Sequence, residues 1–217
     1  MKSHIITIFP ESFDSYFKSS IVWNAINKGL FEPVFYKLND FSDRPQNRVD
    51  DKAYWMHWQV ISAEPISKCI DFIFEKVWKK IPVIYMTPSW DLLCQGKVEN
   101  YLEILWEEFI IICGHYEWID SRIVDLYVDY EISIWEYVLS SWEISAMVFL
   151  DSMVRNISWV LWNSKSLMEE SFSKDFFWKK EHPIYTRPQE FKGKKVPEVL
   201  MSWNHKKIEE WKYNNLK

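Results

Sequence analysis

Short apolar runs alternate along the chain with segments of helical spacing. The apolar runs are rich in β-branched and aromatic residues, and we expect strands at 5–9, 34–36, 83–86 and 109–113. Between these runs, apolar residues recur every three or four positions, which predicts helices over 66–74 and 98–106. Because strands and helices alternate, the pattern favours an α/β fold with a mostly parallel sheet.

The last third of the chain has a different organisation. Ile144, Met147, Leu150 and Val154 lie on one face of a helix that Ser140 or Ser141 would cap. A polar, serine-rich stretch follows, and the pattern at 206–212 predicts a short helix. We therefore expect a main domain at 1–158, a linker at 159–174 and a small, basic helical domain at 175–217.

Charge is distributed unevenly over the 217 residues. The net charge is −5, but the segment from Lys174 onward has 11 lysine and arginine residues against six aspartate and glutamate residues, a local charge of +5. Such a tail can bind phosphates, although basic tails are also common on proteins that bind no nucleic acid.

The cysteines and the N-terminus indicate the cellular compartment. Cys69, Cys94 and Cys113 have no CxxC spacing and are odd in number, which favours buried free thiols over disulfides or a zinc site. The first apolar run is short and no cleavage site follows it, and no run is long enough to span a bilayer. We expect a cytoplasmic protein with no membrane partner.

Seven segments, in this order, resemble one known family. They are ITIFPESF at 6–13, RVDDKAY at 48–54, CGHYEWID at 113–120, EISIWEYVLSSWE at 131–143, EESF at 169–172, YTRP at 185–188 and VPEVLMSWNHKKIEEW at 196–211. Together they resemble the bacterial tRNA (guanine-37-N1)-methyltransferases of the SPOUT superfamily. The resemblance implies a deep trefoil knot, a homodimer, and methyl transfer from S-adenosylmethionine to N1 of guanosine 37 in tRNA.

The resemblance also implies a donor site made of loops whose backbone holds adenine and ribose while apolar side chains cover the ring. Ile134, Val138 and Leu139, taken singly, suit an ordinary core equally well. The residues assigned to this site are Tyr85, Met86, Pro88, Gly114, Tyr116, Trp118, Ile134, Trp135, Glu136, Tyr137, Val138, Leu139, Ser141 and Trp142.

Three residues match catalytic or positioning residues of the family. Removing the N1 proton of guanine requires a base, and Glu170 stands where relatives commonly have aspartate. Arg155 would stabilise the charge that develops on the base, although an arginine after a helix also suits the helix dipole. Asp50 would position the nucleotide, with a solvated acidic loop as an equally good interpretation.

The basic tail would contact the phosphates of the anticodon stem. His57 and His115 lack paired ligands at metal spacing, so we predict no protein metal site, and the resemblance leaves a magnesium requirement open. The tail residues assigned to the RNA are Lys179, Lys180, Arg187, Lys192, Lys194, Lys195, Lys206 and Lys207.

The chain contains 4 glycines and 14 tryptophans. Ordinary usage would give roughly 15 glycines in a chain of this length. Several tryptophans stand where the family has glycine, namely Trp118, Trp135, Trp142, Trp159, Trp162 and Trp203. We hypothesise that most tryptophans are glycines in the living protein, because the source reads UGA as glycine; the alternative is a genuinely tryptophan-rich protein, which UGG codons would indicate.

Two other functions remain open at this stage. One is an inert tRNA-binding protein that keeps the fold but cannot admit the donor, which real tryptophans at positions 135 and 142 would favour. The other is a knotted methyltransferase that acts on a different RNA site.

Overall fold

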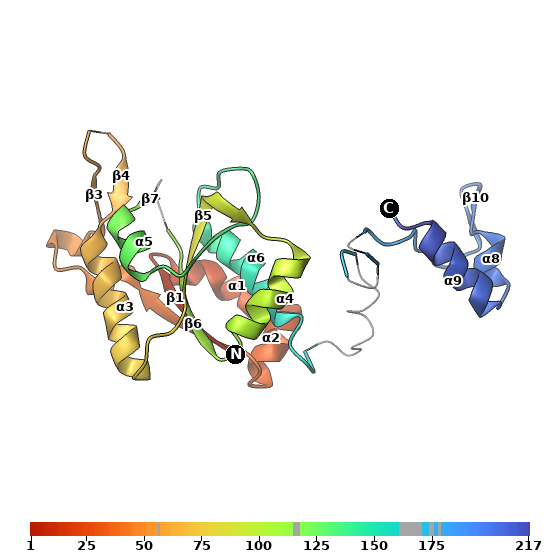
Figure 1. Ribbon diagram of the computed structural model, residues 1–217, viewed down its shortest axis with the longest axis horizontal. Coiled ribbons are helices and arrows are strands. Elements are labelled where there is room, and N and C mark those ends of the chain that lie inside the picture. Colours follow the sequence, from red (N-terminus) through yellow and green to blue (C-terminus); the bar gives the residue numbers. More distant parts are fainter. Residues whose placement is uncertain (56, 115–117, 161–170, 174–175, 178) are drawn as a thin grey trace. The chain divides into compact units, whose positions relative to one another are not determined.

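The computed structural model describes residues 1–217 except 56, 115–117, 161–170, 174–175 and 178, and except the side chains of 89–91. The chain divides into two compact units, residues 1–161 and residues 162–217. Figure 1 shows the elements of both units.

A five-stranded parallel sheet forms the centre of the first unit, as the alternation of strands and helices predicts. Its strand order is β2-β1-β6-β5-β8. The four expected strands are confirmed, and the fifth, β8, was not predicted. The bounds are β1 (Lys2–Thr7), β2 (Glu32–Lys37), β5 (Val83–Leu92), β6 (Glu108–Ile112) and β8 (Tyr130–Ser133).

Helices cover both faces of this sheet. Buried side chains of α3 and α5 pack on one face, and those of α2, α4 and α6 pack on the other. The central strands are therefore buried on both sides, which explains why β6 has four consecutive apolar residues, Phe109 to Ile112. The helices are α1 (Asp14–Phe17), α2 (Ser20–Asn27), α3 (Ala63–Val77), α4 (Gln95–Ile104), α5 (Ser121–Tyr127) and α6 (Trp142–Val154), with single-turn 3₁₀ segments at Pro10–Phe13, Leu38–Phe41 and Pro45–Asn47.

The expected helices over 66–74, 98–106 and 144–154 correspond to α3, α4 and α6, with α4 ending two residues early. Ser141 is the residue that precedes α6, but its hydroxyl makes no capping bond to the helix backbone. It donates instead to a side chain inside the helix, as described below.

A small second sheet stands beside the main one. Its strands are β3 (Asp50–Lys52), β4 (Gln59–Ile61) and β7 (Trp118–Ile119), in the order β3-β4-β7. The antiparallel β3–β4 hairpin projects from the body of the unit (Figure 1) and carries the exposed side chains of Tyr54, Trp55 and Trp58.

The second unit contains a β-hairpin and two helices. They are β9 (Glu190–Phe191), β10 (Lys194–Lys195), α8 (Glu198–Met201) and α9 (His205–Asn214), and α9 includes the expected helix at 206–212. The ring of Trp211 in α9 lies 5.7 Å from that of His182 and 6.3 Å from that of Tyr185, between ring centroids. These contacts fix the helix against the irregular segment that precedes the hairpin.

All three cysteines are free. Cys69 and Cys113 are buried as expected, and burial raises the pKa of both thiols. The expectation is wrong for Cys94, which is exposed because it precedes α4 in an extended conformation. In the described parts of the chain, no helix is long and apolar enough to cross a bilayer.

Candidate functional site

An irregular loop follows β8 at the carboxyl edge of the main sheet. Residues 134–141 form no helix or strand, and the side chains of Trp135, Tyr137 and Val138 in this loop are exposed. The hydroxyl of Ser133 donates to the backbone oxygen of Trp135 at 2.9 Å and fixes the start of the loop. Ligands of parallel α/β sheets bind at this edge. The exposed apolar side chains of the loop could pack over the flat ring of such a ligand.

Gly114, Tyr85 and Trp142 meet at the same edge. A Cβ atom added to Gly114 would lie 3.1 Å from Cδ1 of Trp142 and 3.5 Å from Cε2 of Tyr85, so the indole rests against bare backbone. Tyr85 and Met86 are buried at this end of β5, and burial raises the pKa of Tyr85 to about 12. Gly114, Trp142, Tyr85 and its neighbour Met86 are all assigned to the donor site from the sequence. They lie together at the carboxyl edge of the main sheet.

The neighbouring strand segments also carry predicted residues. Met86 and Asp91 both align with Ile132 of β8, so the stretch that contains Pro88 leaves the hydrogen-bonded ladder. Proline has no N–H to donate, which is consistent with this interruption. Trp118 pairs with Val60 in the small sheet, and Tyr116 lies outside the described residues.

Sequence reasoning missed one polar residue of this region, Glu143. Its side chain is fully buried in the first turn of α6. Thr7, at the end of β1, donates its hydroxyl to Oε1 at 2.6 Å, and Ser141 donates to Oε2 at 2.7 Å. A buried carboxylate is tolerated only when it is hydrogen-bonded, and these two bonds satisfy that of Glu143. Because Ser141 ends the loop and Thr7 ends β1, the same two bonds also link the loop to the central sheet. The sequence does contain one signal for this role, because Glu143 is an acidic residue at the start of an otherwise mostly apolar helix.

Replacing Glu143 with alanine is expected to lower the free energy of unfolding by about 2–4 kcal/mol, because the buried hydroxyl of Thr7 and the half-buried hydroxyl of Ser141 lose a charged acceptor. Chemical denaturation measures this loss. Glu136→Ala is the matched control, since Glu136 is an exposed acid of the neighbouring loop and should change stability by less than about 0.5 kcal/mol. Equal effects of the two substitutions would show that Glu143 does not hold the loop.

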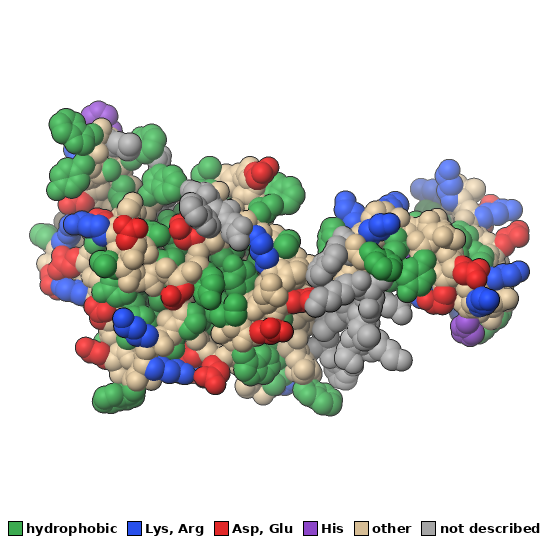
Figure 2. All heavy atoms as spheres, in the orientation of Figure 1, with side chains coloured by type: hydrophobic (Ala, Val, Ile, Leu, Met, Phe, Trp, Pro, Cys, Tyr) green, Lys and Arg blue, Asp and Glu red, His purple; other side chains and the backbone are tan. Residues whose placement is uncertain are grey.

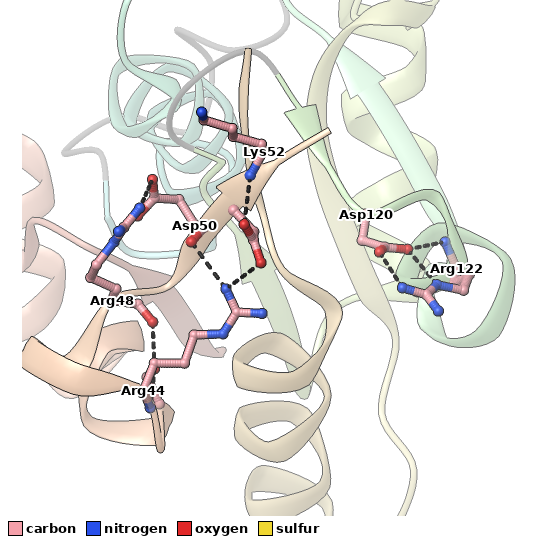
Figure 3. A network of polar contacts seen from close by, with 8 residues as sticks. Arg44, Arg48, Asp50, Lys52, Asp120 and Arg122 are labelled. Atoms are coloured by element: carbon pink, nitrogen blue, oxygen red, sulfur yellow. Dashed lines mark hydrogen bonds and ion pairs between the residues drawn. The ribbon is translucent and has the colours of Figure 1, made fainter. Parts of the chain in front are cut away.

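Asp50 belongs to a separate polar network on the β3–β4 hairpin (Figure 3). Its carboxylate is 3.4 Å from Nη2 of Arg48, and its backbone oxygen accepts from Arg44 at 3.1 Å. Arg44 also bonds Asp51, and the backbone N–H of Lys52 together with the charge of Arg44 lowers the pKa of the Asp51 carboxyl. Asp50 is thus an ordered, paired acid and not a freely solvated one.

A cavity of about 660 Å³ lies next to this network. Arg44 and Asp51 line it from the hairpin side, and Asp120 and Arg122 line it from the start of α5. Hydrogen bonds from Arg122 lower the pKa of Asp120, and Figure 3 shows this pair with its dashed contacts. Two ion pairs, Arg44 with Asp51 and Arg122 with Asp120, therefore contribute to the lining of the cavity.

Arg155 does not lie beside the loop of residues 134–141 of its own chain, the predicted donor loop. It follows the last turn of α6, whose first residue is Trp142. At 1.5 Å per residue, the helix separates the two by about 20 Å, which is well beyond the reach of an arginine side chain. Glu170 lies outside the described residues.

The eight basic residues assigned to the RNA are all exposed on the second unit. Figure 2 shows lysine and arginine side chains over much of the visible surface of this unit, with acidic side chains among them. Lys195 lies 3.8 Å from Glu190, a loose surface pair that leaves the amine accessible. Among the described residues, no three histidine, cysteine, aspartate or glutamate side chains are placed to share a metal ion.

Comparisons with known proteins agree over the full length of the chain. The family model described as "tRNA (Guanine-1)-methyltransferase TrmD" matches residues 1–217. A protein of Clostridioides difficile (strain 630) named "tRNA (guanine-N(1)-)-methyltransferase" is 42% identical over 214 residues, which cover 98% of this chain and 90% of the relative. A protein of the same name from Bacillus cereus (strain AH820) is 40% identical over 214 residues, covering 98% and 86%.

A solved structure is also similar. The crystal structure of tRNA (m1G37) methyltransferase from Aquifex aeolicus superimposes with a TM-score of 0.78 at 34% identity, covering 98% of this chain and 88% of that one.

Proposed function

Because the chain belongs to the tRNA (guanine-1)-methyltransferase family, we propose that it transfers a methyl group from S-adenosylmethionine to N1 of guanosine 37 in tRNA. The observation that carries the proposal is the full-length match, with 42% identity to a relative named for this reaction at guanine N1. Position 37 follows from the similar solved structure, which is named for m1G37.

The donor binds where the loop of residues 134–141 meets Gly114 and Tyr85. Gly114 fits this role, since a backbone without a Cβ atom lets a ligand approach closely. The exposed apolar side chains of the loop cover the adenine, and backbone groups hold the ribose. When bound, S-adenosylmethionine supplies an electrophilic methyl group on a sulfonium.

The residues of the chain prepare the guanine for this methyl group. Glu170 accepts the N1 proton, which raises the nucleophilicity of the ring nitrogen. Arg155 donates to the guanine carbonyl oxygen, where negative charge develops. Asp50, held by Arg48 and Arg44, positions the nucleotide from the hairpin.

Each active site requires two subunits in this proposal. Arg155 stands about 20 Å from the donor loop along α6 of the same chain, so an arginine that acts at that loop comes from a second copy. The linker that carries Glu170 likewise covers the donor of the partner. This separation supports a homodimer as the working form.

The basic second unit binds the tRNA in this proposal. The exposed lysines of residues 175–217 bind phosphates of the anticodon stem, which positions the RNA without reading its sequence. Guanosine 37 leaves its stack to enter the pocket of the main domain, residues 1–158. The linker, 159–174, connects the two parts, and the protein works in the cytoplasm.

Methyl transfer from labelled S-adenosylmethionine to tRNA transcripts tests this function with the protein purified from its own cells. We expect a transcript with guanosine 37 to be methylated, and one with adenosine 37 to lose the activity. Methylation that persists on the adenosine transcript indicates another RNA site. Binding of tRNA without any methylation indicates an inert RNA-binding protein. Omitting magnesium from the same assay measures any requirement for it.

A further inference from the structure

Four tryptophans adopt the left-handed backbone conformation that favours glycine. The φ angle is 64° at Trp55, 57° at Trp78, 71° at Trp159 and 54° at Trp203. Bulky side chains are rare there because the Cβ atom crowds the following carbonyl oxygen. Among the described residues, ten non-glycine residues have positive φ, and tryptophan supplies four of them although it makes up only 14 of the 217 residues.

Packing does not hold these four indoles in place. Each is at least 83% exposed, whereas tryptophan normally buries most of its large apolar surface. No side-chain contact therefore offsets the backbone strain. Gly29 and Gly193 have φ angles of 67° and 78°, so the chain uses glycine elsewhere for the same conformation.

Two of the positions are helix ends where glycine has a defined role. Trp78 follows the last residue of α3, and its N–H donates to the backbone oxygen of Glu75 at 3.3 Å. Helices commonly end at a glycine in this left-handed conformation. Trp203 stands between Ser202, which directly follows α8, and Asn204, which caps α9, so the chain passes from one helix to the next there within three residues.

Trp142 is a different case, because its indole is buried and not strained. It fills the space against Gly114 and Tyr85 at the carboxyl edge of the sheet. An indole and a purine are both fused rings of six and five atoms and have nearly the same outline. The side chain of Trp142 therefore occupies a space of the size and flatness that an adenine requires.

We propose that residues 55, 78, 142, 159 and 203 are glycines in the functional protein, encoded by UGA codons that the source reads as glycine. Glycine relieves the backbone strain at four of these positions and opens the adenine space at the fifth. The first part stands on backbone geometry alone, and the part that concerns residue 142 rests on the proposed function.

The native protein tests the proposal directly. Tryptic digestion of protein from its own cells yields the peptide 196–206, which contains position 203, and the peptide 208–212, which contains position 211. Mass spectrometry is expected to find glycine at 203 and tryptophan at 211, where the ring packs from α9 against His182. Tryptophan at 203, or UGG codons at the five positions, would overturn the proposal.

Recombinant variants test the strain without reference to function. Starting from the chain with tryptophan at every position, Trp78→Gly and Trp203→Gly together are expected to raise the midpoint of thermal unfolding by roughly 2–8 °C. Trp211→Gly, the matched control, is expected to lower it, because a helix interior loses both propensity and ring contacts. A fall in the midpoint for the first pair contradicts the argument from backbone geometry.

Calorimetry with S-adenosylmethionine tests residue 142. Trp142→Gly is expected to bind the donor at least about tenfold more tightly than the tryptophan form, because the adenine space opens. No gain in affinity overturns this part. If native peptides carry glycine but the glycine protein does not bind the donor, the proposed function fails while the assignment of glycine stands.

Discussion

Replacing Glu170 with glutamine is expected to lower the rate constant of methyl transfer by roughly 10²–10⁴-fold, the usual contribution of a positioned general base. Glutamine keeps the shape of the side chain but cannot accept the N1 proton. Single-turnover assays with a guanosine 37 transcript measure the chemical step apart from tRNA binding.

Glu169→Gln is the matched control for this experiment, because it removes the same charge one residue earlier. We expect its rate constant to stay within a few-fold of the parent. If both variants lose the same activity, the loss reflects the charge of the linker, and the base must be sought elsewhere. Mixing Glu170→Gln chains with chains whose donor loop is inactivated should restore activity, since one intact site then forms across the two subunits.

Replacing Arg155 with methionine is expected to lower the same rate constant by roughly 10²–10³-fold, as the loss of one charged donor to a developing anion does in other enzymes. Arg155→Lys keeps the charge but not the planar fork, so it should recover only part of the rate. The affinity for S-adenosylmethionine should not change in either variant, because in the proposed site the guanidinium contacts the guanine carbonyl oxygen and not the donor. A loss of donor affinity equal to the loss of rate would place Arg155 at the donor instead of the guanine.

The fold could be predicted where the local pattern and the tertiary environment agree. The strands at 83–86 and 109–112 are apolar because helices cover both faces of the sheet. Their apolar sequence is therefore enough to predict that they are buried. The helix around Cys69 shows the same agreement. Strand β8 could not be predicted because Tyr130–Ser133 includes a glutamate. The strand lies at the edge of the sheet and two of its four residues are only half-buried, so its sequence need not be apolar throughout. Cys94 was misjudged because helical neighbours say nothing about a side chain that precedes the helix.

The candidate site could be predicted only as far as the resemblance reached. Gly114, Tyr85 and Trp142 were assigned together and do meet, although their binding of the donor stays a prediction. Glu143 could not be found locally, because its partner Thr7 lies 136 positions away in the sequence. The knot stays a prediction too.

Strand order has a consequence for the way the protein is made. Every neighbouring pair in the main sheet is parallel, so each pairing must wait for a crossover connection. β1 leaves the ribosome first, yet its partner β6 follows only at Glu108–Ile112, and the edge strand β8 comes later still. Non-local pairing of this kind is slow. β2 can cover one edge of β1 early, but the nascent chain exposes the other edge, which pairs with β6, to solvent or chaperones throughout the synthesis of its first hundred residues. The loop that follows β8 is the last part of the sheet edge to be organised.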